Sequence, residues 1–226
     1  MTTRSNCLFE SASGDHKPYI ETLRRLLNKL RFPFAAGDAI GIKLHWGERG
    51  NRGFLPPDYA REIVVALKKI GARPFLFDTT VLYSGGRRTA EDSLKTAADH
   101  GYRPDFLGCP VMIADGMDGR NVISLPAGYK HFDTVQVGNV FDSARGFVIF
   151  SHFKGHMVSL FGGAVKNISM GFASRAQKQR MHSDYHPVLN KKKCTRCGIC
   201  AEVCPTKAAI IHKPDYPLYD LKKCIG

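Results

Sequence analysis

The 226-residue sequence lacks any long hydrophobic run, which argues against a membrane-spanning helix. Its longest apolar stretch, GFVIF, is far shorter than the roughly 20 residues that cross a bilayer as a helix. The N-terminus also has no apolar segment behind its positive charge, as a secretory signal would need. We therefore expect a cytoplasmic protein without a membrane partner.

The sequence also lacks the glycine-rich patterns that bind nucleotides. It contains neither G-x-G-x-x-G nor a Walker loop, so a nucleotide cofactor is not indicated. Low-complexity tracts are missing as well. Hydrophobic residues make up 43% of the chain and charged residues 23%, which is the composition of a globular protein with a proper core.

Acidic residues are scarce relative to basic ones, and the formal net charge is +13. Between residues 173 and 196 the only acid is Asp184, among the basic residues Arg175, Lys178, Arg180, Lys191, Lys192, Lys193 and Arg196. Such a field favours an acidic redox partner or a small anionic substrate, and a solvated basic face is the alternative. Nucleic acid is not an expected partner, because single-strand binding needs interleaved aromatic residues and the stretch offers only Tyr185.

Hydrophobic periodicity alternates between strand and helix. Helices are predicted within 18–32, 56–71, 89–101 and 162–172, and strands within 37–48, 73–80, 110–116 and 145–152. Shorter strands are predicted at 6–10, 121–126 and 133–140. Strands separated by helices indicate βαβ units, so we expect an α/β fold with a mostly parallel sheet and helices on both faces.

Five of the seven cysteines lie between residues 194 and 224, which indicates a metal site rather than disulfides in a reducing compartment. Cys194, Cys197, Cys200 and Cys204 form C-x2-C-x2-C-x3-C, followed by a proline, the spacing of bacterial 4Fe-4S ferredoxins. Zinc is the rival, but its sites usually pair two C-x2-C units across a longer gap. The isolated thiols, Cys7 and Cys109, are predicted to be buried.

The chain stops at KKCIG, which is similar to the opening of a second cysteine run. A complete chain would then hold two 4Fe-4S clusters, and Cys204 and Cys224 would belong to the second. We expect this chain to be truncated there, so that its clusters are incomplete or absent. A single cluster on Cys194, Cys197, Cys200 and Cys224, with Cys204 free, is the alternative.

Polar side chains gather at the carboxyl ends of the predicted strands, where open parallel sheets bind ligands. The candidate catalytic residues are His45, Asp78, Asp115, His152 and Lys166. The candidate ligands for a second metal are His45, His152 and His156, and the candidate substrate-binding residues are Lys43, Lys154, His156 and Asn167. Arg87 and Arg88 precede a predicted helix and form a further candidate anion site. The alternative for each residue is a loop or capping role.

The blocks GIKLHWGERGN, SHFKGHMVSLFGGAVKNISMGF and KQRMHSDYHPVL, with the cysteine run behind them, resemble the DUF362 family of uncharacterised iron–sulfur centre proteins. The resemblance implies a DUF362-like α/β domain over residues 1–187 and a small, partial ferredoxin-like 4Fe-4S module over 188–226. It implies no reaction.

The expected function is a redox protein, in which 4Fe-4S electron transfer is coupled to a small anionic ligand or metal at the strand ends. As an enzyme it would be an oxidoreductase. A non-enzymatic electron carrier or cluster-handling protein, with the α/β domain as scaffold, is the alternative. A hydrolase or isomerase with a His/Asp metal site also remains open.

Overall fold

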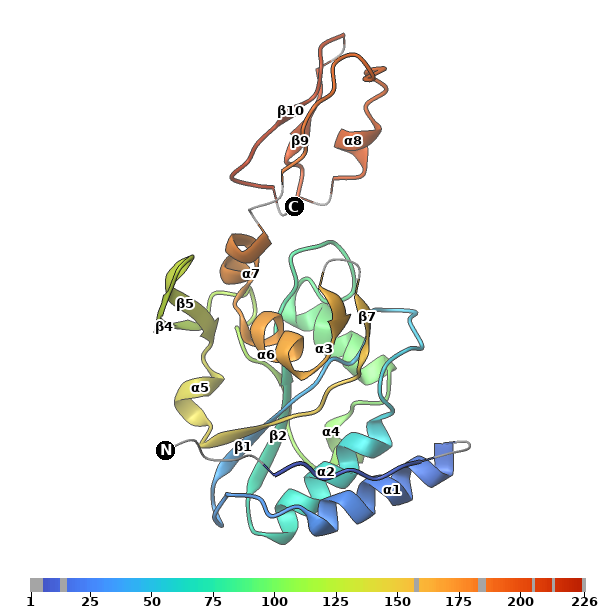
Figure 1. The fold of residues 1–226 in the computed structure, drawn as a ribbon, viewed down its shortest axis with the longest axis vertical. Helices are drawn as coiled ribbons and strands as arrows, with labels where there is room; N and C mark the ends of the chain where they lie inside the picture. The colour runs from blue at the N-terminus through green and yellow to red at the C-terminus, as the bar shows by residue number, and fades with distance from the viewer. Residues whose placement is uncertain are drawn as a thin grey trace.

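A four-stranded parallel sheet lies at the centre of the fold (Figure 1). The structure is a computed structural model and describes residues 6–12, 16–156, 159–182, 186–204, 206–212 and 214–224. The strands are β1 (Ala39–Lys43), β2 (Arg73–Asp78), β3 (Val111–Ile113) and β6 (Gly146–Ile149), in the order β3-β2-β1-β6. Each neighbouring pair is parallel. The predicted α/β fold is confirmed.

Helices cover one face of the sheet because β1 and α2 (Pro57–Lys69) present matching apolar stripes. Ile40 and Ile42 of β1 lie on this face, together with Leu76 of β2. The buried residues of α2 recur at helical spacing, Ala60, Ile63, Val64 and Leu67. Helix α1 (His16–Lys29) packs on α2, and α3 (Ala90–Asp99) and α4 (Pro104–Leu107) border this layer.

Side chains of the opposite pleat form a second, aromatic core. Phe75 and Phe77 point to this face, whereas Leu76 between them points to the other, as strand geometry requires. Phe172, at the end of α6 (Ala164–Phe172), packs edge-on against Phe77 with ring centroids 5.2 Å apart. Helix α5 (Val140–Ser143) contributes Val140 to the same cluster. Helices therefore lie on both faces of the sheet, as predicted.

In the described ranges, three antiparallel hairpins lie outside the four-stranded sheet. The segments predicted as short strands at 121–126 and 133–140 form the hairpin of β4 (Val122–Tyr129) and β5 (Phe132–Gly138). A hairpin that sequence analysis missed joins β7 (Lys154–His156) to β8 (Leu160–Gly162). The strand predicted at 6–10 is wrong, because these residues form no strand.

The C-terminal cysteine segment follows α7 (Arg175–His182) and contains little regular structure (Figure 1). It has one short helix, α8 (Ile199–Glu202), and the hairpin of β9 (Ala209–Ile210) and β10 (Leu218–Tyr219). Gln179 of α7 donates a hydrogen bond to the Lys222 carbonyl at 2.7 Å, so α7 contacts this segment directly. The ferredoxin-like module and the boundary at residue 188 stay predictions.

The two cysteines outside the C-terminal segment, Cys7 and Cys109, differ in burial. Cys109 is buried, as predicted, but Cys7 is exposed, because the N-terminal segment forms no strand that could cover it. Among the described residues, none of the helices combines the length and apolar character needed to span a bilayer.

Gly41 lies at the centre of β1 and permits the aromatic core to close over it. A Cβ atom there would lie 2.8 Å from the rings of both Phe77 and Phe147. We predict that Gly41→Ala lowers the free energy of unfolding by about 1–3 kcal/mol, measured by urea denaturation. Gly155→Ala is the control, because a Cβ there meets no atom within 4 Å. Equal losses in the two variants would contradict this packing.

Candidate ligand-binding site

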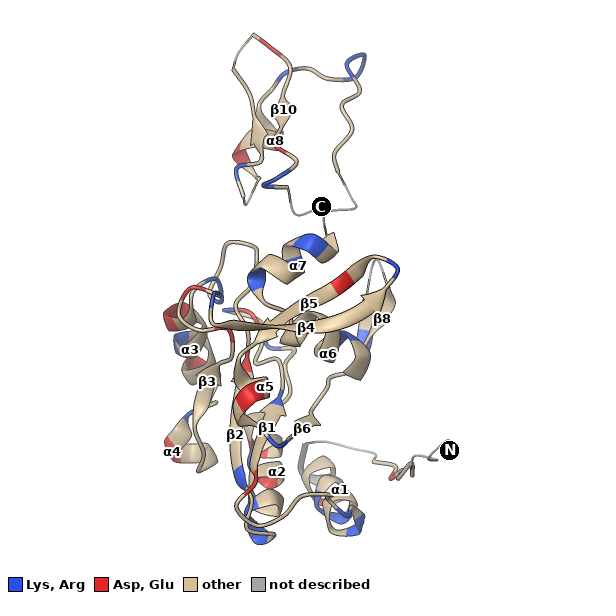
Figure 2. Cartoon of the chain, turned by 90° about the vertical axis from the view of Figure 1, so that its left-hand side faces the viewer, with Lys and Arg blue, Asp and Glu red and all other residues tan. Residues whose placement is uncertain are grey.

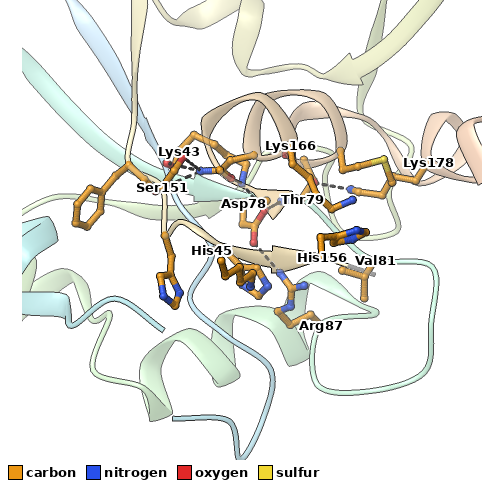
Figure 3. A pocket seen from close by; sticks show the side chains of 18 of the residues that line it. Lys43, His45, Asp78, Thr79, Val81, Arg87, Ser151, His156, Lys166 and Lys178 are labelled. Carbon is orange, nitrogen blue, oxygen red and sulfur yellow. Dashed lines mark hydrogen bonds and ion pairs between the residues drawn. The ribbon is translucent and has the colours of Figure 1, made fainter. Parts of the chain in front are cut away.

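A cavity of about 520 Å³ opens at the carboxyl ends of β1, β2 and β6 (Figure 3). Its walls come from the segments that follow these strands, from the β7–β8 hairpin and from α6 and α7. Of the nine non-cysteine residues that the sequence suggested for catalysis, metal binding or substrate binding, the structure brings eight together there: Lys43, His45, Asp78, His152, Lys154, His156, Lys166 and Asn167. Asp115 lies outside the lining.

A buried ion-pair network forms the floor of the cavity. Lys43, Asp78 and Arg87 expose only 1%, 3% and 4% of their surfaces. Asp78 Oδ1 lies 2.9 Å from Lys43 Nζ, and Asp78 Oδ2 lies 2.7 Å from Arg87 Nη1. Arg87 also pairs with Glu48, at 2.6 Å, and donates to the hydroxyl of Tyr83 at 2.9 Å. Two cations thus face two carboxylates, and the network is close to neutral.

The Asp78 carboxylate is held in its charged form. Burial alone would raise its pKa, but the adjacent charges of Lys43 and Arg87 outweigh burial and lower the pKa to about 2. Asp78 Oδ1 also accepts the amide of Thr79 at 2.9 Å. A carboxylate so fully bonded and so weakly basic is suited to holding the network together rather than to accepting a proton from a substrate.

The side chains of Lys43 and Asn167 are also engaged inside the protein. Besides Asp78, Lys43 Nζ donates to the Leu44 carbonyl at 2.9 Å and to Asn167 Oδ1 at 2.8 Å. Asn167 Nδ2 donates to the Phe150 carbonyl at 3.2 Å and to Ser151 Oγ at 3.0 Å. Asn167 therefore ties α6 to the ends of both β1 and β6. These contacts indicate a positioning role where sequence analysis expected substrate binding.

A glycine makes this arrangement possible. A Cβ on Gly171 of α6 would lie 2.6 Å from Cε of Lys43 and 2.7 Å from its Nζ, so a larger residue would displace the buried ammonium from its hydrogen bonds. The Gly171 carbonyl accepts the Thr79 hydroxyl at 2.9 Å, which fixes α6 against the end of β2.

Lys178 of α7 is a third buried cation in the wall. Its ammonium donates to Thr79 Oγ1 at 2.6 Å, to the Thr80 carbonyl at 2.7 Å and to the Ala173 carbonyl at 2.8 Å. Burial lowers the pKa of Lys178 to about 8, a shift that the charges of Asp115 and Asp78 partly oppose. No carboxylate among the described residues forms a salt bridge with this ammonium.

Two lysines in the wall of the cavity have no carboxylate partner among the described residues. They are Lys154 of β7 and Lys166 of α6, which flank Gly162. Burial lowers the pKa of Lys166, and the nearby charge of Lys154 adds to this effect. In Figure 3, Lys166, His156 and Lys178 lie on the same side of the pocket.

His45 stands in the cavity wall as a neutral imidazole. Its Nδ1 accepts the amide of Gly47 at 2.9 Å, which places the remaining proton on Nε2. Although part of the residue is exposed, desolvation in the cavity and the charge of Arg87 lower its pKa to about 4.

Asp115 has a place in the fold that explains its absence from the cavity. It is fully buried and accepts hydrogen bonds from Thr80, from the amide at 2.8 Å and from the hydroxyl at 2.6 Å. These bonds fix the turn that follows β2, so Asp115 supports the wall of the site from behind.

Arg87, Thr79 and Lys178 are site residues that sequence analysis undervalued. The pair Arg87–Arg88 was expected to bind an anion beside a helix N-terminus, but Arg87 is neutralised by Asp78 and Glu48. The helix prediction itself is sound, since Thr89 caps α3 by accepting the Asp92 amide. Burial of Arg87 could not be inferred from its position before a helix.

Metal ligands are not gathered in the described part of the chain: no group of three or more His, Cys, Asp and Glu side chains could hold an ion there. This applies to His45, His152 and His156 and also to the cysteines. Cys194, Cys200 and Cys204 are partly buried, Cys197 is exposed and Cys224 is buried. Binding of a metal or cluster by either set stays a prediction.

Cys204 is nevertheless poised as a thiolate. Its sulfur accepts the amide of Ala208 at 3.2 Å. Burial raises the pKa of this thiol, but the amides of residues 206, 208 and 209 and the Thr206 hydroxyl outweigh burial and lower the pKa to about 7. A thiolate that accepts backbone amides is chemically suited to binding iron.

The contacts of Asn167 yield a stability prediction. Asn167→Ala removes one acceptor from the buried Lys43 ammonium and leaves the Phe150 carbonyl without its donor. We expect a loss of about 1–3 kcal/mol in the free energy of unfolding, measured by urea denaturation. Ser169→Ala, on the same helix and exposed, is the control and should change it by less than about 0.5 kcal/mol. An unchanged free energy of unfolding in Asn167→Ala would show that these contacts do not stabilise the fold.

The neutral state of His45 yields a pH prediction. In the unfolded chain this imidazole takes up a proton below its ordinary pKa of 6.5, whereas in the folded protein it does so only near 4. Because of this residue, the free energy of unfolding decreases as the pH falls from 6.5 to 4. The variant His45→Gln should show a smaller decrease over the same pH range. NMR titration of the ring should give a midpoint near 4. A midpoint at 6.5 would contradict the environment described.

The family comparison agrees with this layout. A family model described as "Domain of unknown function (DUF362)" matches residues 40–221, which include the sheet, the cavity and most of the cysteine segment. No curated protein and no solved structure matches the chain. Because the matched region covers most of the sequence, the chain belongs to the DUF362 family.

Proposed function

We propose that this protein is an iron–sulfur redox protein, in which the α/β domain binds a small anionic ligand and 4Fe-4S clusters on the C-terminal cysteines exchange electrons with that ligand. The observation that carries the ligand part is the surplus of positive charge in the cavity. Its lining contains Lys43, Arg87, Lys154, Lys166 and Lys178 but only one carboxylate, Asp78.

The surplus remains after internal pairing is considered. Asp78 and Glu48 neutralise Lys43 and Arg87, and the charge of the buried Asp115 acts on Lys178. Lys154 and Lys166 therefore contribute positive charge that no described carboxylate pairs with. Bringing like charges together in a partly desolvated cavity is unfavourable unless an anion joins them. The volume of about 520 Å³ is within the range of small-molecule sites.

The chemistry of the cysteine segment fits iron. Four cysteines have the ferredoxin spacing, and the backbone turns sharply between them, since Arg196 and Gly198 both have positive φ angles. The thiols of Cys194 and Cys200 raise the pKa of the same residue, Tyr219, after the larger effect of burial, so both lie near it. A 4Fe-4S cluster would supply one-electron transfer at low potential.

Helix α7 supports coupling between the two parts. Lys178 and His182 of α7 line the cavity, while Gln179 of the same helix bonds to the carbonyl of Lys222, two residues before Cys224. Electrons exchanged at the cysteines would therefore enter close to a helix that forms the ligand site.

The basic residues near the cysteines support docking of an acidic redox partner. Lys191, Lys192, Lys193 and Arg196 are exposed, and Arg196 stacks over the Tyr216 ring at 4.3 Å. Lys and Arg appear on both α7 and the C-terminal segment (Figure 2). Charge of one sign near an electron-transfer centre chiefly accelerates the encounter with a partner of opposite charge.

Anaerobic purification with iron, sulfide and zinc analysis tests the redox part. We expect about four irons and four sulfides per bound cluster, with an EPR signal on reduction. The double variant Cys194→Ser/Cys197→Ser should lose this iron, whereas Cys7→Ser, which removes an exposed thiol elsewhere, should retain it. Zinc in place of iron, or no loss in the double variant, would contradict the proposal.

A further inference from the structure

The lining of the cavity combines basic with apolar side chains. Lys154 and Lys166, with His156 and His182 near them, form its cationic end. The apolar side chains are Leu55, Val81, Leu82, Phe150 and Met170. A site built in this way favours a molecule that has both a charged group and an apolar body.

The residues of the cationic end converge from three elements. Lys154 pairs with Gly162 across the β7–β8 hairpin, and a Cβ at Gly162 would lie 3.7 Å from Lys166 Cδ and 3.9 Å from Lys154 Cγ. His182 of α7 is close enough to Lys166 and His156 for their charges to add to burial in lowering its pKa. The two lysine charges are therefore close together and unbalanced by any described carboxylate.

The donors left for a ligand favour one kind of anion. The two-pronged guanidinium of arginine recognises carboxylates and phosphates alike, but Arg87, the arginine among the described lining residues, is occupied by Asp78, Glu48 and Tyr83. The remaining charged donors are lysines, which act as separate point charges. Two lysines side by side match a group with two negative charges, such as a phosphate monoester.

The size of the cavity distinguishes an organic ligand from a bare ion. Its volume of about 520 Å³ lies within the range of roughly 300–1,000 Å³ that is typical of sites for small organic molecules. An inorganic phosphate held at the lysines would leave the apolar side chains facing water. Filling that space with an apolar body adds favourable burial.

We propose that the ligand is a phosphorylated small organic molecule, whose phosphate binds Lys154 and Lys166 and whose apolar body packs against Val81, Leu82 and Met170. This inference rests on the proposed anionic-ligand function and narrows the ligand to a class. The ammonium groups of Lys43 and Lys178 take no direct part, because their hydrogen bonds are used within the protein.

Isothermal titration calorimetry with four probes tests the inference: phenyl phosphate, inorganic phosphate, benzoate and terephthalate. Phenyl phosphate should bind at least about tenfold more tightly than each of the others, since a charge-assisted hydrogen bond contributes about 1.5–3 kcal/mol. Lys154→Ala and Lys166→Ala should each weaken its binding by about tenfold or more. Lys130→Ala removes an exposed lysine outside the lining and should change nothing.

The outcomes separate the ligand class from the broader function. Tighter binding of terephthalate or benzoate would overturn the phosphate assignment and leave the anionic-ligand function standing. Equal binding of inorganic phosphate would overturn the apolar part. If none of the probes binds, both the phosphate assignment and the proposed anion site are overturned. The iron–sulfur part of the proposal would be unaffected, because the iron analysis tests it separately. Lys166→Met, which keeps the aliphatic stem, replaces Lys166→Ala if circular dichroism shows that the alanine variant is unfolded.

Discussion

The pairing of the buried Asp78 carboxylate with Lys43 and Arg87 is the interaction on which the rest of the site depends. Asp78 ends β2, Lys43 ends the neighbouring β1, and Arg87 reaches them from the loop before α3. An unpaired charge at this depth costs several kcal/mol, so the Asp78 carboxylate requires its cations and Lys43 requires the carboxylate. Lys43 in turn requires Asn167 and a glycine at position 171, and these requirements fix the position of α6.

This internal pairing also determines which charges face a ligand. A count of cations alone would make Lys43 and Arg87 the centre of an anion site, yet both are satisfied by carboxylates. Lys154 and Lys166 come from elements added beyond the sheet, the β7–β8 hairpin and α6, and the described residues offer them no carboxylate. The floor of the cavity is thus structural and its outer wall is available for binding.

Much of this arrangement could be predicted from the sequence, because parallel strands place their carboxyl ends at one edge and polar residues follow each strand. The roles of the individual residues could not be predicted in this way. Asp78 and Asp115 look alike in the sequence, but one lies in the cavity and the other bonds to Thr80 behind it. The contact of Arg87 with Asp78 spans 9 positions, and the hydrogen bonds of Lys178 to Thr79 and Thr80 span 99 and 98. No local pattern reveals such tertiary contacts.

A crystal structure with bound tungstate, a phosphate-shaped dianion, would test the central claim most directly. Anomalous scattering locates tungsten without reference to any model of the ligand. The account predicts one strong peak between the ammonium groups of Lys154 and Lys166, with the Lys43–Asp78–Arg87 network unchanged. A peak coordinated by Lys43 or Arg87, with their carboxylate pairs broken, would contradict it, as would a cavity that stays empty while tungstate binds elsewhere.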